Sequence, residues 1–380
     1  MTRLGDYISE FSVKNHLDES IPVYSVTNDR GFCSGYFNKD VASKDKTTYK
    51  IVPRGYFAYN PSRINVGSIA WQNSAERVIV SPLYVVFKVS DKLDRQYLLH
   101  YLKSDVGMTF IKAHAAGSVR DSLKFSDLKE LPIHVVPLEK QRKIARTLDK
   151  LDALISQCHQ QANSFDTLVK SQFVEMFGTY PANPMGWDTG TIRDIVADVR
   201  YGSSRPAVDG GKYPYLRMNN ITYGGELDLT DTKRIDVPEN ELDKCTVRRG
   251  DVLFNRTNSK ELVGKTCVYN RDEMMVLAGF VIRVRVTKRI LPEFLSAFLN
   301  TDFSKQMLLG MCKAAIGQAN INAQEMQNIG LYLPPVALQQ QFIQFKSQVD
   351  KSKFSCRRAG KVANFALKCI MEDVYGVMDG

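Results

Sequence analysis

The chain has 380 residues, of which 44% are hydrophobic, so its composition excludes a disordered chain and predicts two or three packed domains. Its formal net charge of +10 favours a polyanionic partner, nucleic acid first and an acidic membrane surface second, although a merely basic soluble protein has the same charge. There is no apolar run of the roughly 18–20 residues that a membrane span needs and no signal peptide. Cys and His are scattered, which argues against a disulfide framework or a zinc site and predicts a cytoplasmic protein.

Residues 1–136 are predicted to form a mixed α/β domain. Short β-rich runs such as Val78–Val89 alternate with turn residues and a few short helices. The stretch RGYFAYNPSR begins with a turn at Arg54-Gly55, where glycine supplies a positive φ. A short apolar strand follows and ends at Asn60.

Residues 137–178 are predicted to form a long helix. Pro137 lies near its start, and Gly178 marks its end. Apolar residues recur at a spacing of 4-3-4-3-4-3-4, which is the pattern of a heptad seam that requires a partner helix. The seam residues are Ile144, Leu148, Leu151, Ile155, Cys158, Ala162, Phe165 and Val169.

Residues 179–333 repeat the mixed pattern of the first domain. The stretch RGDVLFNRTNS, from Arg249 to Ser259, again combines an Arg-Gly turn, an apolar strand and a terminal Asn. The run Met275–Val286 is a second β-rich segment.

Residues 334–380 are predicted to form a second long helix with a weaker seam. Two lysines and a glycine interrupt this seam, so the helix is best explained as the antiparallel partner of the first. The pair is expected to form a rod of about 60 Å with the globular domains at opposite ends. Packing of each helix on its own domain is the alternative. The aligned positions are Phe342, Lys346, Val349, Lys353, Cys356, Gly360, Ala363 and Leu367.

The two halves of the chain are an internal duplication. Five blocks recur in one order at offsets of 195 to 198 residues, and fixed periods of this kind define the architecture. The expected fold class is therefore α+β, with two pseudo-repeated mixed α/β domains separated by two long helices packed as an antiparallel coiled coil. The paired blocks begin at Arg54 and Arg249, Glu76 and Glu273, Tyr97 and Phe294, Pro137 and Pro335, and Phe173 and Met371.

Catalytic motifs are missing from the sequence. It has no GxGxxG, no GxxxxGK[ST], no GxSxG, no HExxH and no [DN]PP[YF] tetrapeptide. The sequence therefore predicts a protein that binds and assembles, without catalytic residues.

Polar and basic residues of the loops are the candidate DNA contacts. Asn and Gln can pair with adenine, Arg with guanine, and Ser, Thr and Lys suit phosphates. The candidates in the first domain are Thr27, Arg30, Asn60, Arg63, Ser118 and Arg120. Those in the second are Tyr201, Ser203, Ser204, Arg205, Arg217, Asn219, Asn220, Asn255, Arg256, Thr257, Asn258, Ser259, Lys260, Gln318 and Asn320.

Structural explanations compete with DNA contact at several of these positions. Asn60 and Asn255 close a strand, where Asn is also a common turn residue. Arg63, Arg256 and Lys260 could be solvated surface charge, but their position beside Asn and Ser favours DNA contact. Cys158 and Cys356 share one seam position and are most simply small core residues.

Along its whole length the chain resembles the specificity (S) subunit of type I restriction–modification systems. The motifs PLEKQRKIARTLDKLD (137–152) and PPVALQQQF (334–342) carry the resemblance of the helices. The RGDVLFNRTNS box, LVGKT (262–266) and GQANI (317–321) resemble the target recognition domains of that family.

The resemblance implies a division of labour along the chain. Residues 1–136 and 179–333 would be target recognition domains, each reading one half of a bipartite, asymmetric DNA sequence. The helices would fix the spacer and dock two methyltransferase (M) subunits, which hold S-adenosylmethionine and methylate adenine. Restriction (R) subunits would bring ATP and Mg²⁺, and this chain itself would hold no cofactor or metal and catalyse nothing.

The second helix departs from the ideal pattern at Lys346, Lys353 and Gly360. Either the helices are less close near their middle, or the two lysines face a partner subunit or DNA. Two other classes of function are open: a degenerate or fused DNA methyltransferase or nuclease, and a coiled-coil scaffold without DNA function.

Overall fold

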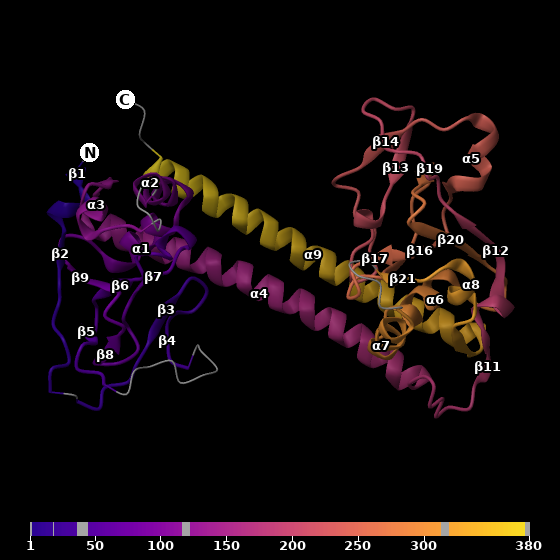
Figure 1. The fold of residues 1–380 in the computed structure, drawn as a ribbon, viewed down its shortest axis with the longest axis horizontal. Coiled ribbons are helices and arrows are strands. Elements are labelled where there is room, and N and C mark those ends of the chain that lie inside the picture. Colours follow the sequence, from indigo (N-terminus) through magenta and orange to yellow (C-terminus); the bar gives the residue numbers. More distant parts are fainter. Residues whose placement is uncertain (1, 18, 36–44, 116–121, 313–318, 377–380) are drawn as a thin grey trace. The chain divides into compact units, whose positions relative to one another are not determined.

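The computed structural model describes residues 2–17, 19–35, 45–115, 122–312 and 319–376 (Figure 1). The chain divides into two compact units. Unit 1 consists of residues 1–159 and 358–380, and unit 2 of residues 160–357. Each unit therefore contains a globular part and a segment of each of two long helices.

Unit 1 is built on a four-stranded antiparallel sheet in the order β2-β9-β6-β7. Its strands are Ile8–Glu10 (β2), Val85–Val89 (β9), Phe57–Tyr59 (β6) and Ile69–Trp71 (β7). Three two-stranded pairs accompany it: Thr2–Arg3 with Pro132–Ile133 (β1-β10), Ser25–Thr27 with Gly31–Cys33 (β3-β4), and Lys50–Pro53 with Arg77–Val80 (β5-β8). The short helices are Arg95–Lys103 (α1), Asp105–Ala115 (α2) and Phe125–Lys129 (α3), with 3₁₀ turns at Leu4–Asp6 and Ile64–Val66.

Unit 2 repeats this plan and adds a larger second sheet. Its main sheet has the order β12-β20-β16-β18, with strands Val196–Tyr201, Val281–Val286, Val252–Asn255 and Thr266–Val268. The second sheet has the order β14-β13-β19-β15, with strands Lys233–Ile235, Tyr213–Leu216, Met275–Leu277 and Thr246–Val247. Two further pairs are Asp188–Thr191 with Gly330–Leu333 (β11-β22) and Thr257–Asn258 with Ala319–Asn320 (β17-β21). The helices are Glu239–Cys245 (α5), Pro292–Leu299 (α6), Asp302–Met311 (α7) and Ala323–Gln327 (α8), with 3₁₀ turns at Ile192–Ile195 and Met218–Asn220.

The repeated Arg-Gly stretch forms the same inner strand of the main sheet in both units. In β6, Phe57 and Tyr59 face the core that α1 covers, while Ala58 faces a second cluster. In β16, Phe254 faces the larger core of unit 2 and Leu253 a smaller one. Alternation with period 2 explains both patterns. The glycine after each arginine has a positive φ, 85° at Gly55 and 90° at Gly250, so the predicted turn is confirmed.

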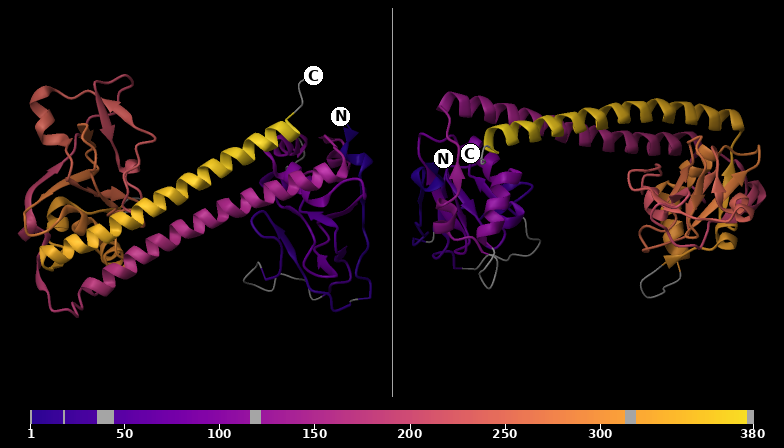
Figure 2. Two further views of the ribbon diagram at one scale, coloured as in Figure 1. Left: turned by 180° about the vertical axis from the view of Figure 1, so that it is seen from behind. Right: turned by 90° about the horizontal axis from the view of Figure 1, so that it is seen from above.

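The two long helices each span 40 residues, Leu138–Phe177 (α4) and Val336–Tyr375 (α9). Unit 1 holds the beginning of α4 and the end of α9, and unit 2 holds the end of α4 and the beginning of α9. Within each unit the two segments lie side by side and run in opposite directions (Figure 2). The predicted pair of antiparallel helices is therefore confirmed.

In unit 1 the helices meet closely at a glycine. Leu148 and Cys158 are buried, and Ile144, Leu151 and Ile155 pack around a core that also contains Leu367. A Cβ atom placed on Gly360 would lie only 3.2 Å from the Cβ of Cys158. The expectation that Gly360 weakens the approach of the helices is wrong, because the missing side chain is what permits it.

In unit 2 the seam is partly ionic. Val349 is buried and Phe165 half-buried. Lys353 is also buried; its Nζ pairs with Asp166 of α4 and lies 2.9 Å from Oε1 of Glu226. A lysine enclosed by two carboxylates faces neither DNA nor a partner subunit, so that expectation is wrong for Lys353.

Two further seam residues are half-buried in unit 2. Lys346 pairs with Asp350 one turn along α9 at 2.5 Å. Cys356 lies 2.9 Å from Oε1 of Gln161 on α4. Both contacts keep polar groups of the seam partnered.

Both helices also bear an aromatic anchor at their last turn. Phe177, at the end of α4, packs edge-on against Phe294 of α6 with ring centroids 4.9 Å apart. Tyr375, at the end of α9, packs 5.2 Å from the ring of Tyr97 of α1, and its hydroxyl donates to the Tyr97 carbonyl. The last turn of α4 thus contributes to the core of unit 2, where α9 begins. The last turn of α9 contributes to the core of unit 1, where α4 begins.

Candidate nucleic-acid interface

The end of the main sheet in unit 2 gathers several of the predicted DNA contacts. Tyr201 ends β12, and Arg256 follows β16 two strands away. The guanidinium of Arg256 lies over the Tyr201 ring, 4.8 Å from its centroid. The Tyr201 hydroxyl accepts a hydrogen bond from the Ala323 amide at 2.9 Å, which fixes the ring against α8. This geometry holds a cation on an aromatic face at the surface of the unit.

The residues after Arg256 form a small ladder beside this pair. Thr257 and Asn258 pair with Asn320 and Ala319 in β17-β21. Thr257 is buried, Asn258 and Ser259 are half-buried, and Lys260 and Asn320 are exposed. The structure therefore brings together Tyr201, Arg256, Asn258, Lys260 and Asn320, whereas Gln318 lies outside the described residues.

Asn255 supports this surface from below. It is fully buried, and its backbone bonds to Lys265 and Gly264 on the adjoining chain. In the amide orientation that suits its surroundings, its nitrogen donates to the carbonyls of Phe280 and Thr257, and its oxygen accepts from Asn258. A side chain with no exposed surface and all these bonds holds a loop, as the turn interpretation predicts.

Arg217 and Asn220 serve a loop elsewhere in unit 2. Asn220 is 2% exposed; its amide oxygen accepts from the Arg217 amide, and its nitrogen donates to the carbonyls of Asp228 and Asp231. Arg217 pairs with the Asp231 carboxylate at 2.9 Å. The neighbouring Asn219 is exposed. Arg217 and Asn220 of the YLRMNN cluster thus bond within their own loop.

The loop after Tyr201 is held in a similar way. The hydroxyl of Ser203 accepts from the Arg205 amide at 3.2 Å, and Ser204 is exposed. Both Nε and Nη2 of Arg205 donate to the carboxylate of Glu241. Because this pair is exposed, it contributes little stability and can exchange Glu241 for another anion.

In unit 1 two predicted loops surround one small pocket. Thr27 and Asn60 contribute to its wall together with Arg63. Thr27 is buried and accepts from the Arg30 amide, while Arg30 and Arg63 are exposed. Asn60 accepts from the Ser62 amide at 3.1 Å, which is a turn bond. Ser118 and Arg120 lie outside the described residues.

A buried glutamine at the start of each long helix escaped the sequence prediction. Gln141 is fully buried; its Nε2 donates to the carbonyls of Lys92 and Val136, and its Oε1 accepts from the Asp94 amide. Gln339 makes the same three bonds 198 residues later, to the carbonyls of Arg289 and Pro334 and from the amide of Leu291. The signal was present, since Gln is identical in the repeated PLEKQ and PVALQ motifs.

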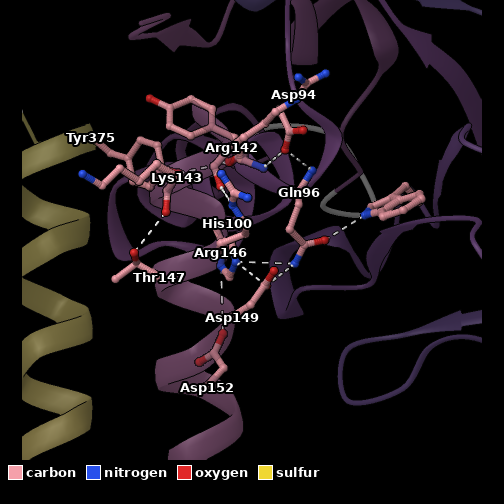
Figure 3. Close-up of polar contacts among 12 residues, drawn as sticks. Asp94, Gln96, His100, Arg142, Lys143, Arg146, Thr147, Asp149, Asp152 and Tyr375 are labelled. Atoms are coloured by element: carbon pink, nitrogen blue, oxygen red, sulfur yellow. Dashed lines mark hydrogen bonds and ion pairs between the residues drawn. The ribbon is translucent and has the colours of Figure 1, made fainter. Parts of the chain in front are cut away.

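Unit 1 adds a polar network between α1 and α4 (Figure 3). Trp71 donates to Gln96 at 2.9 Å, and Gln96 donates to Asp149 of α4 at 2.7 Å. Nε2 of the buried His100 lies 2.9 Å from the same Asp149 oxygen, and its Nδ1 lies 3.9 Å from Asp152. These bonds tie the main sheet to the long helix, so the network positions the domain on the helix.

Metal and membrane sites do not appear in the described parts of the chain. No three His, Cys, Asp or Glu side chains there gather as metal ligands. None of the helices in those parts combines the length and apolar character that a membrane crossing needs.

Comparison with known proteins gives the family of the chain. The family model described as "Type I restriction modification DNA specificity domain" matches residues 11–164 and again 184–360. The chain belongs to this family, and its two halves are two copies of the domain.

Individual relatives agree with this family. The chain is 24% identical over 272 residues to the specificity subunit of the type I restriction enzyme EcoKI of Escherichia coli K12, and 22% identical over 268 residues to that of StySPI of Salmonella potsdam. Each match covers 67% of this chain and 58% of the relative, so the chain spans less than two thirds of their length.

A solved structure shares the fold. The S subunit of a type I restriction–modification system from M. genitalium superposes with a TM-score of 0.59 at 15% identity, over 99% of this chain and 96% of that one. The predicted resemblance to specificity subunits is confirmed by the family and by these relatives.

Proposed function

We propose that the chain is the non-catalytic DNA-sequence specificity subunit of a type I restriction–modification enzyme. Each of the target recognition domains, residues 1–136 and 179–333, reads one half of a bipartite, asymmetric DNA target. The long helices, residues 137–178 and 334–380, set the spacer between the half-sites. Together these roles make the chain a device that recognises two separated sequences at once.

One observation carries the proposal: the two units repeat one strand order but differ in the loops at the end of the inner strand. Strands β2, β9, β6 and β7 correspond in order to β12, β20, β16 and β18. After the shared Asn, unit 1 continues with Pro61, Ser62 and Arg63, and unit 2 with Arg256, Thr257 and Asn258. A common frame with different surface loops is what two readers of different half-sites require.

The contacts are assigned to the predicted residues that lie at the surface. In unit 2 they are Tyr201, Arg256, Asn258, Ser259, Lys260 and Asn320, with Ser204 and Asn219 as outer candidates. In unit 1 they are Arg30 and Arg63. The buried Asn220, Asn255, Thr27 and Thr257 act by holding these loops in place. A net charge of +10 suits phosphate contacts along the same surfaces.

The assembled enzyme requires partner subunits, and α9 offers a surface for one. Val362 and Phe365, which both belong to unit 1, are 62% and 70% exposed. At about 100° per residue they lie only about 60° apart around the helix, opposite the seam. We propose that the two methyltransferase subunits, which hold S-adenosylmethionine, dock on such exposed apolar positions of the long helices. Restriction subunits with ATP and Mg²⁺ complete the enzyme.

The decisive experiment is methylome sequencing of cells that express this chain together with a cognate methyltransferase subunit. We expect one bipartite motif with a fixed spacer. Arg256→Ala should alter only one half-site, and Arg63→Ala only the other. If either variant changed both half-sites equally, the assignment of one unit to one half-site would be refuted.

Two measurements separate this function from its alternatives. Binding of DNA by the complex should weaken steeply with salt, because phosphate contacts release counterions. A flat salt dependence without sequence preference would favour a scaffold protein. Binding of S-adenosylmethionine or cleavage of DNA by this chain alone would favour a degenerate methyltransferase or nuclease.

A further inference from the structure

An exposed phenylalanine lies beside the Tyr201–Arg256 pair of unit 2. Phe280 precedes β20, and its carbonyl accepts from the Arg256 amide at 3.0 Å. Because Tyr201 pairs with Ile282 in the same strand ladder, Phe280 lies between the strands that carry Arg256 and Tyr201. The Phe280 side chain is 55% exposed. Because water contacts more than half of this large apolar side chain, hydrophobic burial does not explain the position, which invites a functional explanation.

The same position is exposed and apolar in the other copy. In the alignment of Glu76–Val89 with Glu273–Val286, Phe280 corresponds to Leu83. Leu83 precedes β9 and is 76% exposed. Single exposed apolar residues are common on protein surfaces, but here both copies place one at the same turn of the main sheet.

Arg256 next to Phe280 is not neutralised by an acidic side chain. It is half-buried, its Nε is buried without a hydrogen bond, and within the described parts of the chain no carboxylate pairs with its guanidinium. In contrast, Arg205 pairs with Glu241 and Arg217 with Asp231. A guanidinium that is oriented by Tyr201 but not neutralised is ready for an external acceptor.

A nucleotide is the ligand that fits this combination. Base edges and phosphates offer acceptors to a guanidinium, and the base faces, sugars and thymine methyl groups offer apolar surface to Phe280. The excess of positive charge on the chain favours DNA over an acidic or neutral apolar partner.

We propose that Phe280 is a specificity-determining residue, which packs against a nucleotide of one half-site next to the nucleotide bound by Arg256. Leu83 has the same role in the other half-site. This inference rests on the proposed function, because it assumes that the units bind DNA. It adds an apolar contact to a recognition surface that was assigned so far to the polar loops.

The test compares four single variants of the chain in complex with its methyltransferase subunit: Phe280→Ala, Phe280→Tyr, Leu83→Ala and Met274→Ala. Met274 is the control, since it is 45% exposed and precedes β19, at the other end of that strand from Phe280. The probes are duplexes in which each base pair of the target, found by methylome sequencing, is replaced in turn. Denaturation of the isolated chain in a Trp71→Phe background, followed by the fluorescence of Trp187, checks that Phe280→Ala leaves unit 2 folded.

We expect Phe280→Ala to weaken binding of the target about tenfold and to lose discrimination at one or two base pairs of a single half-site. Leu83→Ala should do the same in the other half-site, Met274→Ala should match the wild type, and Phe280→Tyr should restore most of the affinity. If Phe280→Ala matched Met274→Ala, or weakened all duplexes equally, the inference would be overturned while the proposed function stood. If the wild-type complex preferred no sequence, the proposed function itself would fail.

Discussion

The buried glutamine Gln339 offers the sharpest test of how the globular part of unit 2 is fixed to its long helix. Gln339→Leu preserves the approximate volume of the side chain but removes all three of its hydrogen bonds. The carbonyls of Arg289 and Pro334 and the amide of Leu291 then lose their partner in a buried site. Each unsatisfied buried group costs about 1–3 kcal/mol, so we expect a loss of roughly 3–5 kcal/mol in the stability of unit 2. This is a large part of the about 5–15 kcal/mol typical of a domain.

The two tryptophans allow each unit to be followed separately, because Trp71 lies in unit 1 and Trp187 in unit 2. In a Trp71→Phe background, urea denaturation monitored by Trp187 should show the midpoint of Gln339→Leu falling by about 1–2 M. The control is Gln340→Leu, one residue along the same helix and exposed, for which a change within about 0.5 kcal/mol is expected. Equal shifts for the two variants would refute the reasoning.

Three further changes test other contacts by fluorescence, with Trp187 as the reporter of unit 2 and Trp71, in a Trp187→Phe background, as the reporter of unit 1. Gly360→Val should lower the stability of unit 1 by about 1–3 kcal/mol, since its new side chain meets Cys158; an unchanged midpoint would show that the helices separate easily. Burial opposes the ionisation of Glu226, but hydrogen bonds from Lys353 and Arg357 of α9 outweigh this effect and lower the pKa of Glu226. The ion pairs of Glu226 therefore stabilise unit 2 above about pH 4.5, and this stabilisation is lost as pH falls. Glu226→Gln should therefore flatten the stability of unit 2 between about pH 5 and pH 3, and a profile identical to the wild type would contradict this. Burial lowers the pKa of Lys305 to about 8, so unit 2 should gain stability as pH rises from there towards the ordinary lysine value. Lys305→Met introduces the residue found at the equivalent position of the first copy, Met108. This variant should raise the stability of unit 2 near neutral pH and abolish its rise at higher pH.

The duplication made most of the fold predictable from sequence. Heptad spacing located both long helices, and α4 and α9 lie within the predicted segments 137–178 and 334–380. The alternation of Phe57 and Tyr59 with Ala58 is visible in the sequence and reappears as two sides of one strand. Local pattern therefore sufficed where one periodicity governed a whole segment.

What could not be predicted depends on contacts between distant residues. Lys353 looks like a flaw in the seam until Glu226, 127 residues away, is seen beside it. Asn255 and Arg256 are neighbours in a polar loop, yet one is buried and the other lies at the surface on an aromatic ring. Composition cannot separate a polar residue that holds a loop from one that is free to bind, because both favour turns.

The division of the chain into units has a consequence for its synthesis. The core of unit 1 includes Tyr375, whose ring packs on Tyr97 and Tyr101. Nascent chains fold from the N-terminus as they leave the ribosome, but these two tyrosines emerge more than 270 residues before their partner. Unit 1 therefore completes its core only after the whole of unit 2 has been translated. A message broken anywhere before the last helical turns yields a product with an open core, which is exposed to proteolysis.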